Sequence, residues 1–223
     1  MQKYKVHCSA ISAIMAKATL GRTISVGAET AIKDWYIGQL YDRKKPSASS
    51  KYTDKGNEKE GDAIRFLSKV HGDFYSKNNK TFDNEHLVGT PDIVASDAII
   101  DIKCSWDCFT FPYFDTKLNK AYWCQMQGYM ALTGKKRAIV AYCLMDATFD
   151  QIERAISDYC KANNCELTEE IEEKVTAQMM YEHLPTTLRL REFEVLRDDD
   201  FINSIYERVD AMRSFINEKT AML

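Results

Sequence analysis

A short apolar run that carries two charged residues is the feature that most constrains how this chain can fold. The run Ala98 to Cys104 reads AIIDIKC, and its three isoleucines leave few positions for solvent, which predicts a buried β-strand. Side chains alternate along a strand, so Asp101 and Lys103 are expected on one face. Charged groups in a core strand cost free energy unless they are paired or used. The simplest interpretation is an Asp–Lys pair that satisfies itself, and the other is a functional site.

A second acid lies close to this strand in the sequence. Asp92 follows a proline in the segment GTPDIV, nine residues before Asp101. Two carboxylates about 4 Å apart at an effective dielectric of ~20 repel by roughly 4 kcal/mol, so acids that converge indicate a cation between them. A strand expected over 86–95 carries Asp92 beside the strand of Asp101, which favours a functional site over a self-contained ion pair.

A third acid, Glu60, falls on the apolar stripe of a helix expected to begin near Gly56. Ala63, Ile64 and Leu67 follow it at spacings of three, four and seven residues, which is the spacing of one helix face. A buried carboxylate without a partner is costly, so Glu60 is a candidate for the same site. The alternative is a glutamate at the edge of the stripe whose carboxylate reaches water.

A further helix, expected over 117–133, carries two polar groups on an apolar face. That face consists of Leu118, Ala121, Tyr122, Gln125, Tyr129 and Leu132. Gln125 and Tyr129 are one turn apart, so both are expected to face the same neighbour. The alternative for Gln125 is a core glutamine that is bonded to a backbone carbonyl. A loop rich in aromatic residues, 106–114, joins this helix to the strand of Asp101.

The rest of the chain alternates between strand and helix patterns, which predicts an α/β fold with a mixed central β-sheet flanked by α-helices. We expect strands over 3–7, 137–145 and 187–196, a hairpin over 73–82, and helices over 9–21, 27–40 and 198–218. Residues 147–183 have an acidic helical pattern in which we find no chemistry. The length of 223 residues, of which 45% are hydrophobic, is consistent with a single domain over 1–223.

The net charge of −3 is distributed unevenly along the chain. Residues 1–145 carry a balance of +6 and residues 146–223 a balance of −9, which indicates either a basic working face or chance clustering on solvated helices. A polar stretch over 42–55 is expected to be an exposed loop, and it is equally compatible with phosphate contacts or with plain solvation. Its candidate contact residues are Arg43, Lys44, Lys45, Lys51 and Lys55, with Tyr52 available for stacking.

Several classes of protein are disfavoured by what the sequence lacks. There is no run of about 18 apolar residues and no apolar signal region at the start, so no membrane segment is expected. Seven cysteines without paired spacing favour reduced thiols in the cytosol. Zinc sites and Ser–His–Asp or Cys–His catalysis have no supporting spacing. An iron–sulfur cluster on Cys8, Cys160 and Cys165 would need one more late cysteine.

Taken together, these motifs resemble the PD-(D/E)xK nuclease superfamily and its RecB-like branch. The order is Glu60 on a helix, then Asp92, Asp101 and Lys103 on strands, then a Q-x-x-x-Y element that runs from Gln125 to Tyr129. Within that branch the chain is most similar to the lambda exonuclease, or YqaJ-type, family of phage recombination nucleases. The matching segments are GNEKEGDA at 56–63, the stretch 89–105, the Q-x-Q helix at 124–133 and the early helix start at Cys8-Ser9-Ala10.

This resemblance implies a fold and an activity. The expected fold is a restriction-endonuclease-like core in one domain, with residues 147–183 as a helical insertion. The expected activity is a metal-dependent double-strand DNA exonuclease, 5′→3′, that generates single-stranded DNA for phage-type recombination in a bacterial or phage-infected cytoplasm. No Walker-type loop is present, so hydrolysis is expected to be independent of ATP.

The resemblance also implies roles for residues. Two Mg²⁺ or Mn²⁺ ions are expected on Glu60, Asp92, Asp101 and the carbonyl of Ile102. Lys103 would orient or deprotonate the attacking water, with Gln125 and Tyr129 in support. The matched early helix start adds Ser9 to the expected DNA contacts. The others are the candidates already taken from the charge of the 42–55 stretch, namely Arg43, Lys44, Lys45, Lys51, Tyr52 and Lys55.

The expected partners are double-stranded DNA ends, a single-strand annealing protein and further copies of the chain. The lambda-type exonucleases are toroidal trimers, so a trimeric ring with the basic residues of the first part along its channel is the implied assembly. Two alternatives stay open. A restriction-type or structure-specific endonuclease shares the core and would cut closed circular DNA. A non-catalytic DNA-end-binding protein would have a broken motif, whereas every position is filled here.

Overall fold

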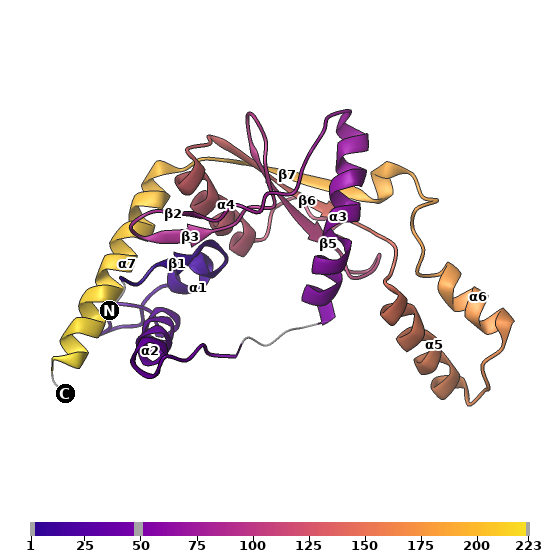
Figure 1. The fold of residues 1–223 in the computed structure, drawn as a ribbon, viewed down its shortest axis with the longest axis horizontal. Coiled ribbons are helices and arrows are strands. Elements are labelled where there is room, and N and C mark those ends of the chain that lie inside the picture. Colours follow the sequence, from indigo (N-terminus) through magenta and orange to yellow (C-terminus); the bar gives the residue numbers. More distant parts are fainter. Residues whose placement is uncertain (1–2, 47–50, 222–223) are drawn as a thin grey trace.

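The computed structural model describes residues 3–46 and 51–221, with the side chains of 51–54 and 57 excepted. It has a mixed α/β architecture with two sheets rather than one, and helices pack on both faces of the larger sheet (Figure 1). The smaller sheet has the order β1 (Val6–His7), β3 (Leu87–Gly89), β2 (Phe82–Asp83). The larger has the order β4 (Ile93–Val94), β5 (Ile99–Cys104), β6 (Arg137–Cys143), β7 (Leu190–Leu196).

The larger sheet places the charged strand in its interior. Strand β5 pairs antiparallel with β4 and parallel with β6, and β6 pairs antiparallel with β7. The register sets Asp101 opposite Val140 and Lys103 opposite Tyr142. The buried strand predicted over 98–104 is therefore confirmed, and the parallel β5–β6 pair needs the intervening helix as its crossover.

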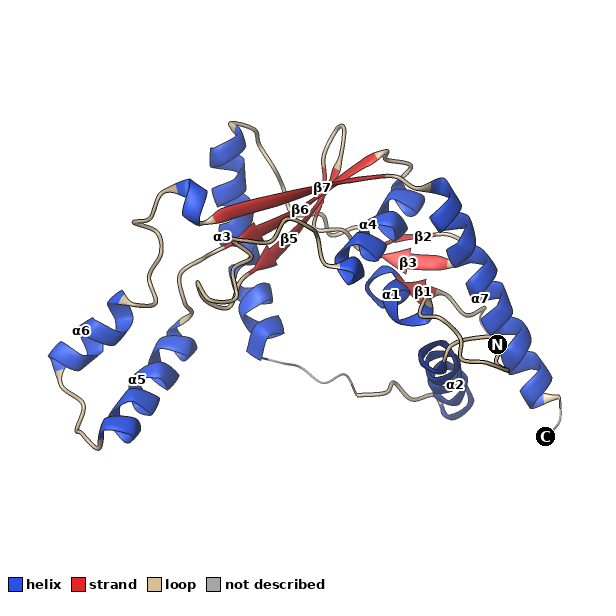
Figure 2. Cartoon of the chain, turned by 180° about the vertical axis from the view of Figure 1, so that it is seen from behind, coloured by secondary structure: helices blue, strands red, loops and turns tan. Residues whose placement is uncertain are grey.

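Two helices cover the two faces of this sheet (Figure 2). Helix α3 (Lys51–His71) packs Ala63, Ile64 and Leu67 against Ile100 and Ile102 of β5. Helix α4 (Lys120–Thr133) covers the opposite face in a cluster that includes Ile99, Ala138 and Val140. Because side chains alternate along β5, Asp101 and Lys103 lie on the face of α4.

The first N-terminal helix is shorter than the sequence pattern predicts, whereas the second is found where it was expected. The helix expected over 9–21 is a 3-10 turn, η1 (Cys8–Ala10), followed by α1 (Ile11–Ile14). The chain then turns at Gly21, which has a left-handed φ of 82°, and re-enters the core through buried Ile24. Helix α2 (Val26–Tyr41) begins after Ser25, whose hydroxyl accepts a hydrogen bond from the Ala28 amide.

Two loop predictions are wrong. The exposed loop expected over 42–55 ends early, because α3 already begins at Lys51. The hairpin expected over 73–82 is absent among the described residues, since 74–81 contain no strand and β2 pairs with β3 instead. The Asn78 amide side chain donates to the carbonyls of Lys80 and Pro91, and this holds the segment as an irregular loop against the site.

The strand expected over 86–95 is split between the two sheets. Its first part is β3 and its second part is β4, with the break at residues 90–92. Pro91 has no amide hydrogen to donate to a ladder, which accounts for an interruption at this point. The break matters because Asp92, immediately after the proline, is freed from regular pairing.

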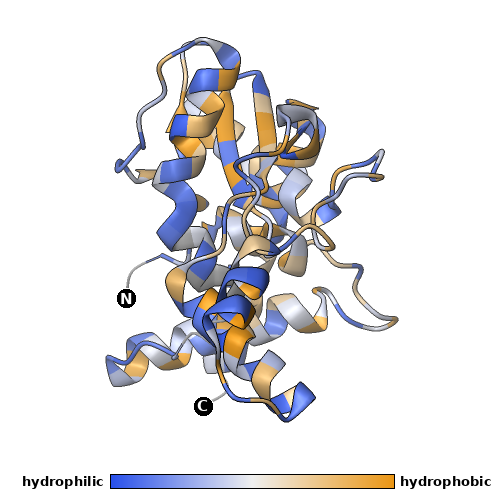
Figure 3. Cartoon of the chain, turned by 90° about the vertical axis from the view of Figure 1, so that its right-hand side faces the viewer, coloured by the Kyte–Doolittle hydropathy of each residue, from blue (hydrophilic) through white to orange (hydrophobic). Residues whose placement is uncertain are grey.

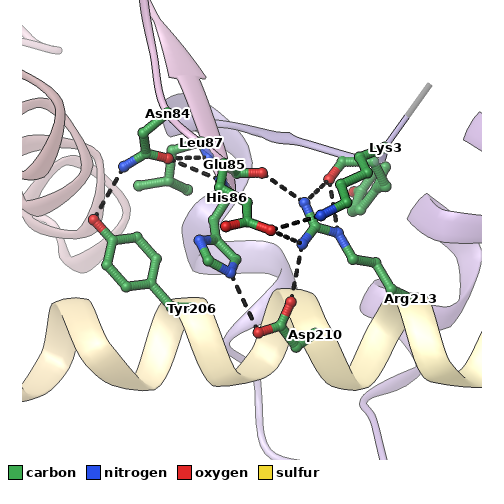
Figure 4. A network of polar contacts seen from close by, with 9 residues as sticks. Lys3, Asn84, Glu85, His86, Leu87, Tyr206, Asp210 and Arg213 are labelled. Carbon is green, nitrogen blue, oxygen red and sulfur yellow. Dashed lines mark hydrogen bonds and ion pairs between the residues drawn. The ribbon is translucent and has the colours of Figure 1, made fainter.

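A network of polar contacts fastens the smaller sheet to the last helix, α7 (Asp199–Thr220) (Figure 4). Arg213 donates to the carbonyls of Tyr4 and Glu85, at 2.7 Å and 2.6 Å from its Nη2. Asn84 donates to the Tyr206 hydroxyl at 3.1 Å, and His86 contacts Asp210 at 3.2 Å. These contacts tie both ends of the chain to the turn between β2 and β3.

Residues 147–183 are helical, as their pattern predicts, and they form an extension from the body of the protein (Figure 1). Helix α5 (Phe149–Asn163) has a capping box at Thr148, and α6 (Glu169–Ala177) returns beside it before η2 (Thr186–Leu188) leads into β7. Hydrophilic and hydrophobic residues alternate along both helices in Figure 3.

All seven cysteines are free thiols. None of the helices, as far as the structure describes them, combines the length and the apolarity needed to cross a membrane.

Candidate active site

Strand β5 holds Asp101 and Lys103 side by side on one face. The Asp101 side chain is 2% exposed, and its Oδ2 lies 2.6 Å from Lys103 Nζ. Lys103 keeps 23% of its side chain exposed, so the pair has one buried end and one end that reaches a pocket. The Lys103 ammonium also lies 4.8 Å from the centre of the Tyr122 ring. The predicted shared face of the two residues is confirmed.

The break at Pro91 places Asp92 at the open edge of β5. Asp92 Oδ2 accepts a hydrogen bond from the backbone amide of Ile102 at 2.7 Å. If β4 continued past this point, its backbone would bond to that amide instead. The N–H and C=O of one strand residue point to the same edge, so the Ile102 carbonyl faces the side of Asp92 as well. The two strands therefore bring both predicted aspartates and this carbonyl together.

Helix α4 adds two polar side chains from above the same face. Gln125 donates its amide hydrogens to the Tyr129 hydroxyl at 2.9 Å and to Asp101 Oδ1 at 3.5 Å. The Tyr129 hydroxyl donates to the Thr90 carbonyl at 3.2 Å. Gln125 is therefore not the core glutamine bonded to a backbone carbonyl that was its alternative interpretation. That description fits Gln127, which donates to the Leu196 carbonyl and accepts from the Asp198 amide.

Glu60 reaches the site from α3. Its carboxylate is an ion-pair partner of Lys77 at 2.7 Å, and its side chain is 16% exposed. Its other oxygen, Oε1, is buried and has no hydrogen-bond partner among the described residues. The expectation of an inward acid on the apolar stripe is confirmed, and Lys77 is a contact that its sequence position did not predict.

These residues line one pocket of about 500 Å³. It is lined by Gly56, Glu60, Asp92, Asp101, Ile102, Lys103, Cys104, Ser105, Trp106, Thr110, Tyr122, Gln125, Tyr129 and Tyr142. All six predicted catalytic positions are present in this set. The tyrosines at 122 and 142 and the start of the aromatic loop were not predicted as part of the site. Only Tyr122 carried a signal, because it shares the helix face of Gln125.

The electrostatics of the pocket reflect acids brought together out of water. Burial and the Asp101 carboxylate raise the pKa of Asp92 to about 7, although the Ile102 amide opposes this. Burial also raises the pKa of Asp101, and Lys103 opposes that shift. Burial alone would lower the pKa of Lys103, but the Asp101 carboxylate outweighs it and raises the pKa. Lys103 therefore stays charged at neutral pH.

The donor set fits a hard cation. Carboxylate and carbonyl oxygens are the ligands that Mg²⁺ and Mn²⁺ prefer, and Glu60 Oε1 is a buried oxygen that lacks a partner among the described residues. Within the described part of the chain, no three side chains of His, Cys, Asp or Glu are close enough to hold an ion together as they stand. Two of these acids are paired with ammonium groups, Glu60 with Lys77 and Asp101 with Lys103.

The predicted DNA contacts are not all available at the surface. Lys55 is buried, and its ammonium donates to the carbonyls of Trp106 at 2.7 Å and Met145 at 3.1 Å. Burial lowers the pKa of Lys55 to about 8. It therefore fastens α3 to the ends of β5 and β6 instead of reaching into solvent, which corrects the prediction that it lies in an exposed loop.

The other candidate DNA-contact residues lie in different surroundings. Ser9 is exposed in η1 outside the pocket, and Arg43, Lys44 and Lys45 are exposed after α2. Lys45 is paired with Asp34 at 2.6 Å. The side chains of Lys51 and Tyr52 lie outside the described residues.

The raised pKa of Asp92 predicts how stability depends on pH in the absence of metal. Between pH 4 and pH 7 the unfolded Asp92 is ionised while the folded one holds its proton, so stability should fall as pH rises through that window. Thermal unfolding in EDTA at pH 5 and pH 8 measures this. The fall should be smaller in Asp92→Asn than in the wild type. An equal fall in both proteins would mean that Asp92 is not the group responsible.

No protein-family model and no curated protein sequence matches the chain. Among solved structures, it is similar to a phage-related exonuclease from Haemophilus somnus 129PT, with 27% identity, a TM-score of 0.78, and coverage of 99% of this chain and 97% of that chain.

An alkaline exonuclease from Laribacter hongkongensis, LHK-Exo, is a more distant match. It has 18% identity and a TM-score of 0.64, over 98% of this chain and 94% of that chain. The same enzyme in complex with dAMP matches with a TM-score of 0.65, over 96% of this chain and 89% of that chain. At this identity the likeness is one of fold.

Proposed function

We propose that this chain, a structural relative of the phage-related and alkaline exonucleases with the motif order of the PD-(D/E)xK superfamily, is a DNA exonuclease. Its substrate is the end of double-stranded DNA, and its product is single-stranded DNA for recombination of the phage type, available to an annealing protein. The observation that carries the proposal is the buried Asp101–Lys103 pair at the pocket, with Asp92 and Gln125 in contact with the same strand.

The acids and the Ile102 carbonyl form the cation-binding side of the pocket. Glu60, Asp92, Asp101 and Ile102 O are the oxygens that would hold one or two Mg²⁺ or Mn²⁺ ions. Bound there, the ions would lower the pKa of a water molecule and neutralise charge on the phosphate. The fold sets the positions of these ligand oxygens. Asp101 lies on β5 in contact with Gln125, the Asp92 carboxylate is oriented by the Ile102 amide, and Glu60 extends from α3 into the pocket.

Lys103 and the two residues of α4 form the opposite side. Lys103 is positively charged at neutral pH, so it attracts the phosphate and donates a hydrogen bond to it or to the attacking water. This favours the orienting role over the deprotonating role. Gln125 holds Asp101 Oδ1, and Tyr129 holds Gln125 in turn through a hydroxyl that is fixed on the Thr90 carbonyl. These contacts limit the movement of both groups.

Metal binding should stabilise the folded protein, because a cation relieves the repulsion among the acids and binds the native state only. Millimolar Mg²⁺ or Mn²⁺ is expected to raise the melting temperature of the wild type, and Glu60→Gln and Asp92→Asn should reduce this rise. Asp200→Asn, an exposed acid at the start of α7, is the matched control and should keep it. An equal rise in all four proteins would place the ion elsewhere.

The activity and its direction are tested with linear duplex DNA that carries a label at one 5′ end or at one 3′ end. We expect digestion in Mg²⁺ without ATP, none in EDTA, and release of the 5′ label first. Early release of the 3′ label would reverse the polarity. No release of either label in Mg²⁺ or Mn²⁺ would contradict the proposed function.

We also propose a closed ring, a trimer, in which the basic residues near the end of α2 face the DNA. Enclosing the duplex would let weak phosphate contacts suffice for processive digestion. Of the basic residues assigned to the channel, Arg43, Lys44 and Lys45 are exposed in the described part of the chain. Light scattering at micromolar concentration should give three times the 25.6 kDa chain mass, and a monomer mass would exclude the ring.

A further inference from the structure

We propose that the aromatic loop, residues 106–114 between β5 and α4, stacks against unpaired nucleobases that flank the phosphate in the pocket. The inference rests on the proposed function, because it describes how the same site would hold its DNA. The loop leaves the carboxyl end of β5 directly after Ser105, and Trp106 and Thr110 form part of the pocket wall. A nucleotide bound beside Lys103 would therefore have its neighbours next to the loop.

Three aromatic side chains of the loop lie in solvent. Phe109 is 93% exposed, Phe114 is 90% exposed and Tyr113 is 50% exposed. The rings of Tyr113 and Phe114 contact each other edge to face, with centroids 5.1 Å apart. Single exposed aromatic residues are common on protein surfaces. Three within six residues, in a loop that also lines the pocket through Trp106 and Thr110, are the kind of apolar exposure that marks a binding surface, and we call these three side chains the aromatic patch.

The loop is held in place although its rings are exposed. Phe111 is buried against Leu144 and Tyr181, which anchors the middle of the loop to the body. Asp107 Oδ1 accepts hydrogen bonds from the amides of Phe109 at 3.1 Å and Thr110 at 2.8 Å. Because the loop backbone is already held, a ligand that stacks on these rings would lose little free energy to ordering it, which favours binding.

The chemistry around the rings fits a nucleic acid strand. Every nucleobase has a π-face, so stacking on aromatic side chains tolerates any sequence, as a nuclease that digests arbitrary DNA requires. Lys117 and Lys120 follow the loop, are exposed and have no ion-pair partner among the described residues, so both are free to contact phosphates. Two acids, Asp107 and Asp115, lie on the same segment, and Asp107 is engaged in the turn.

Whether a nucleobase can stack on the aromatic patch depends on whether it is base-paired. In a duplex the bases are stacked on each other, and the face of an internal base is covered by its neighbours. An unpaired base at an opened end has a free face to offer. The aromatic loop should therefore favour opened ends and single strands over intact duplex, in addition to the phosphate contacts of the pocket.

The test measures binding without cleavage, in EDTA, by fluorescence anisotropy. The probes are a labelled single-stranded oligonucleotide and a matched oligonucleotide with abasic sites, which keeps the phosphates and lacks the bases. Phe109→Ala/Phe114→Ala should bind the normal oligonucleotide about 10- to 100-fold more weakly, given the typical strength of base–aromatic stacking. Binding of the abasic oligonucleotide should be unchanged.

Two further variants separate stacking from a structural role. The double variant Phe109→Trp/Phe114→Trp, which replaces both rings with other aromatic rings, should keep the preference of the wild type for normal over abasic DNA. Phe74→Ala removes an aromatic residue that is 86% exposed and outside the aromatic loop, and it should leave both affinities unchanged. An equal loss for both oligonucleotides, or no loss for either, would overturn the inference.

Two outcomes separate base stacking from self-association and from DNA cleavage. If the double variant has a lower mass than the wild type in light scattering and binds both oligonucleotides normally, the patch is a contact between copies of the chain and the inference is wrong. If the wild type discriminates between the oligonucleotides in EDTA but cleaves no DNA in Mg²⁺ or Mn²⁺, the inference stands and the proposed exonuclease activity fails.

Discussion

Replacing Lys103 with methionine should lower the rate of DNA cleavage by a factor of about 100 or more, given the usual effect of losing one charged group from a hydrolytic site. Methionine keeps the apolar stem of the lysine but removes the ammonium that pairs with Asp101 Oδ2 at 2.6 Å. Asp101→Asn should have a comparable effect, because it removes the charge that would hold a cation. The measurement is the initial rate of release of label from linear duplex DNA in Mg²⁺.

The fold must survive for this result to bear on catalysis. Circular dichroism and the melting temperature of each variant provide that check. Lys136→Met is the matched control, since Lys136 is an exposed residue beyond the end of α4 and lies 3.9 Å from Asp199. It should keep wild-type rates. Near wild-type turnover in a folded Lys103→Met would contradict the assignment of the pocket as the hydrolytic centre.

Gly128→Ala should destabilise the protein by about 1–3 kcal/mol, the usual cost of overpacking a core. Alanine is the better helix former, so the sign is opposite to what the helix alone predicts. The reason is the packing of α4 against the N-terminal turn. A Cβ at position 128 would lie 2.5 Å from Ile11 Cδ1 and 2.8 Å from Cys8 Sγ. Unfolding in urea measures the change.

A second glycine is the matched control. Gly61 lies in α3, where an added Cβ would meet Arg65 Nη1 at an ordinary 3.8 Å. Gly61→Ala should therefore stabilise the protein by about 0.5–1 kcal/mol. Combining Gly128→Ala with Cys8→Ala should cost less than the sum of the single changes, because the two residues share one space. Stabilisation by Gly128→Ala would show that η1 and α4 are packed less closely than the structure indicates.

The clustering of the six candidate residues in one pocket could be predicted from the sequence because most of them, Asp92 excepted, rest on a local pattern. The apolar run around Asp101 and Lys103 defines a buried strand, and alternation fixes their common face. The helical spacing behind Glu60 and between Gln125 and Tyr129 places those residues inward. These patterns depend on nearest neighbours along the chain, and the structure preserves them as α3, β5 and α4.

What the sequence did not predict depends on contacts between distant segments. Lys77 meets Glu60 across 17 residues, and Lys55 meets Met145 across 90. Neither lysine differs in its local sequence from lysines that remain in solvent, so the sequence predicts an exposed Lys55 like the other basic residues of 42–55. The division into two sheets was also missed, because Pro91 interrupts a run that otherwise has the pattern of one strand.

The proposed exonuclease cleaves DNA in this pocket only from an end. The most direct measurement uses one plasmid in two forms, linear and covalently closed, incubated with the wild type in Mg²⁺ and with Lys103→Met as the blank. We expect the linear duplex to be digested from its ends and converted to single-stranded DNA, and the closed circle to persist. Cutting of the closed circle at a comparable rate would contradict an exonuclease and identify an endonuclease on the same core.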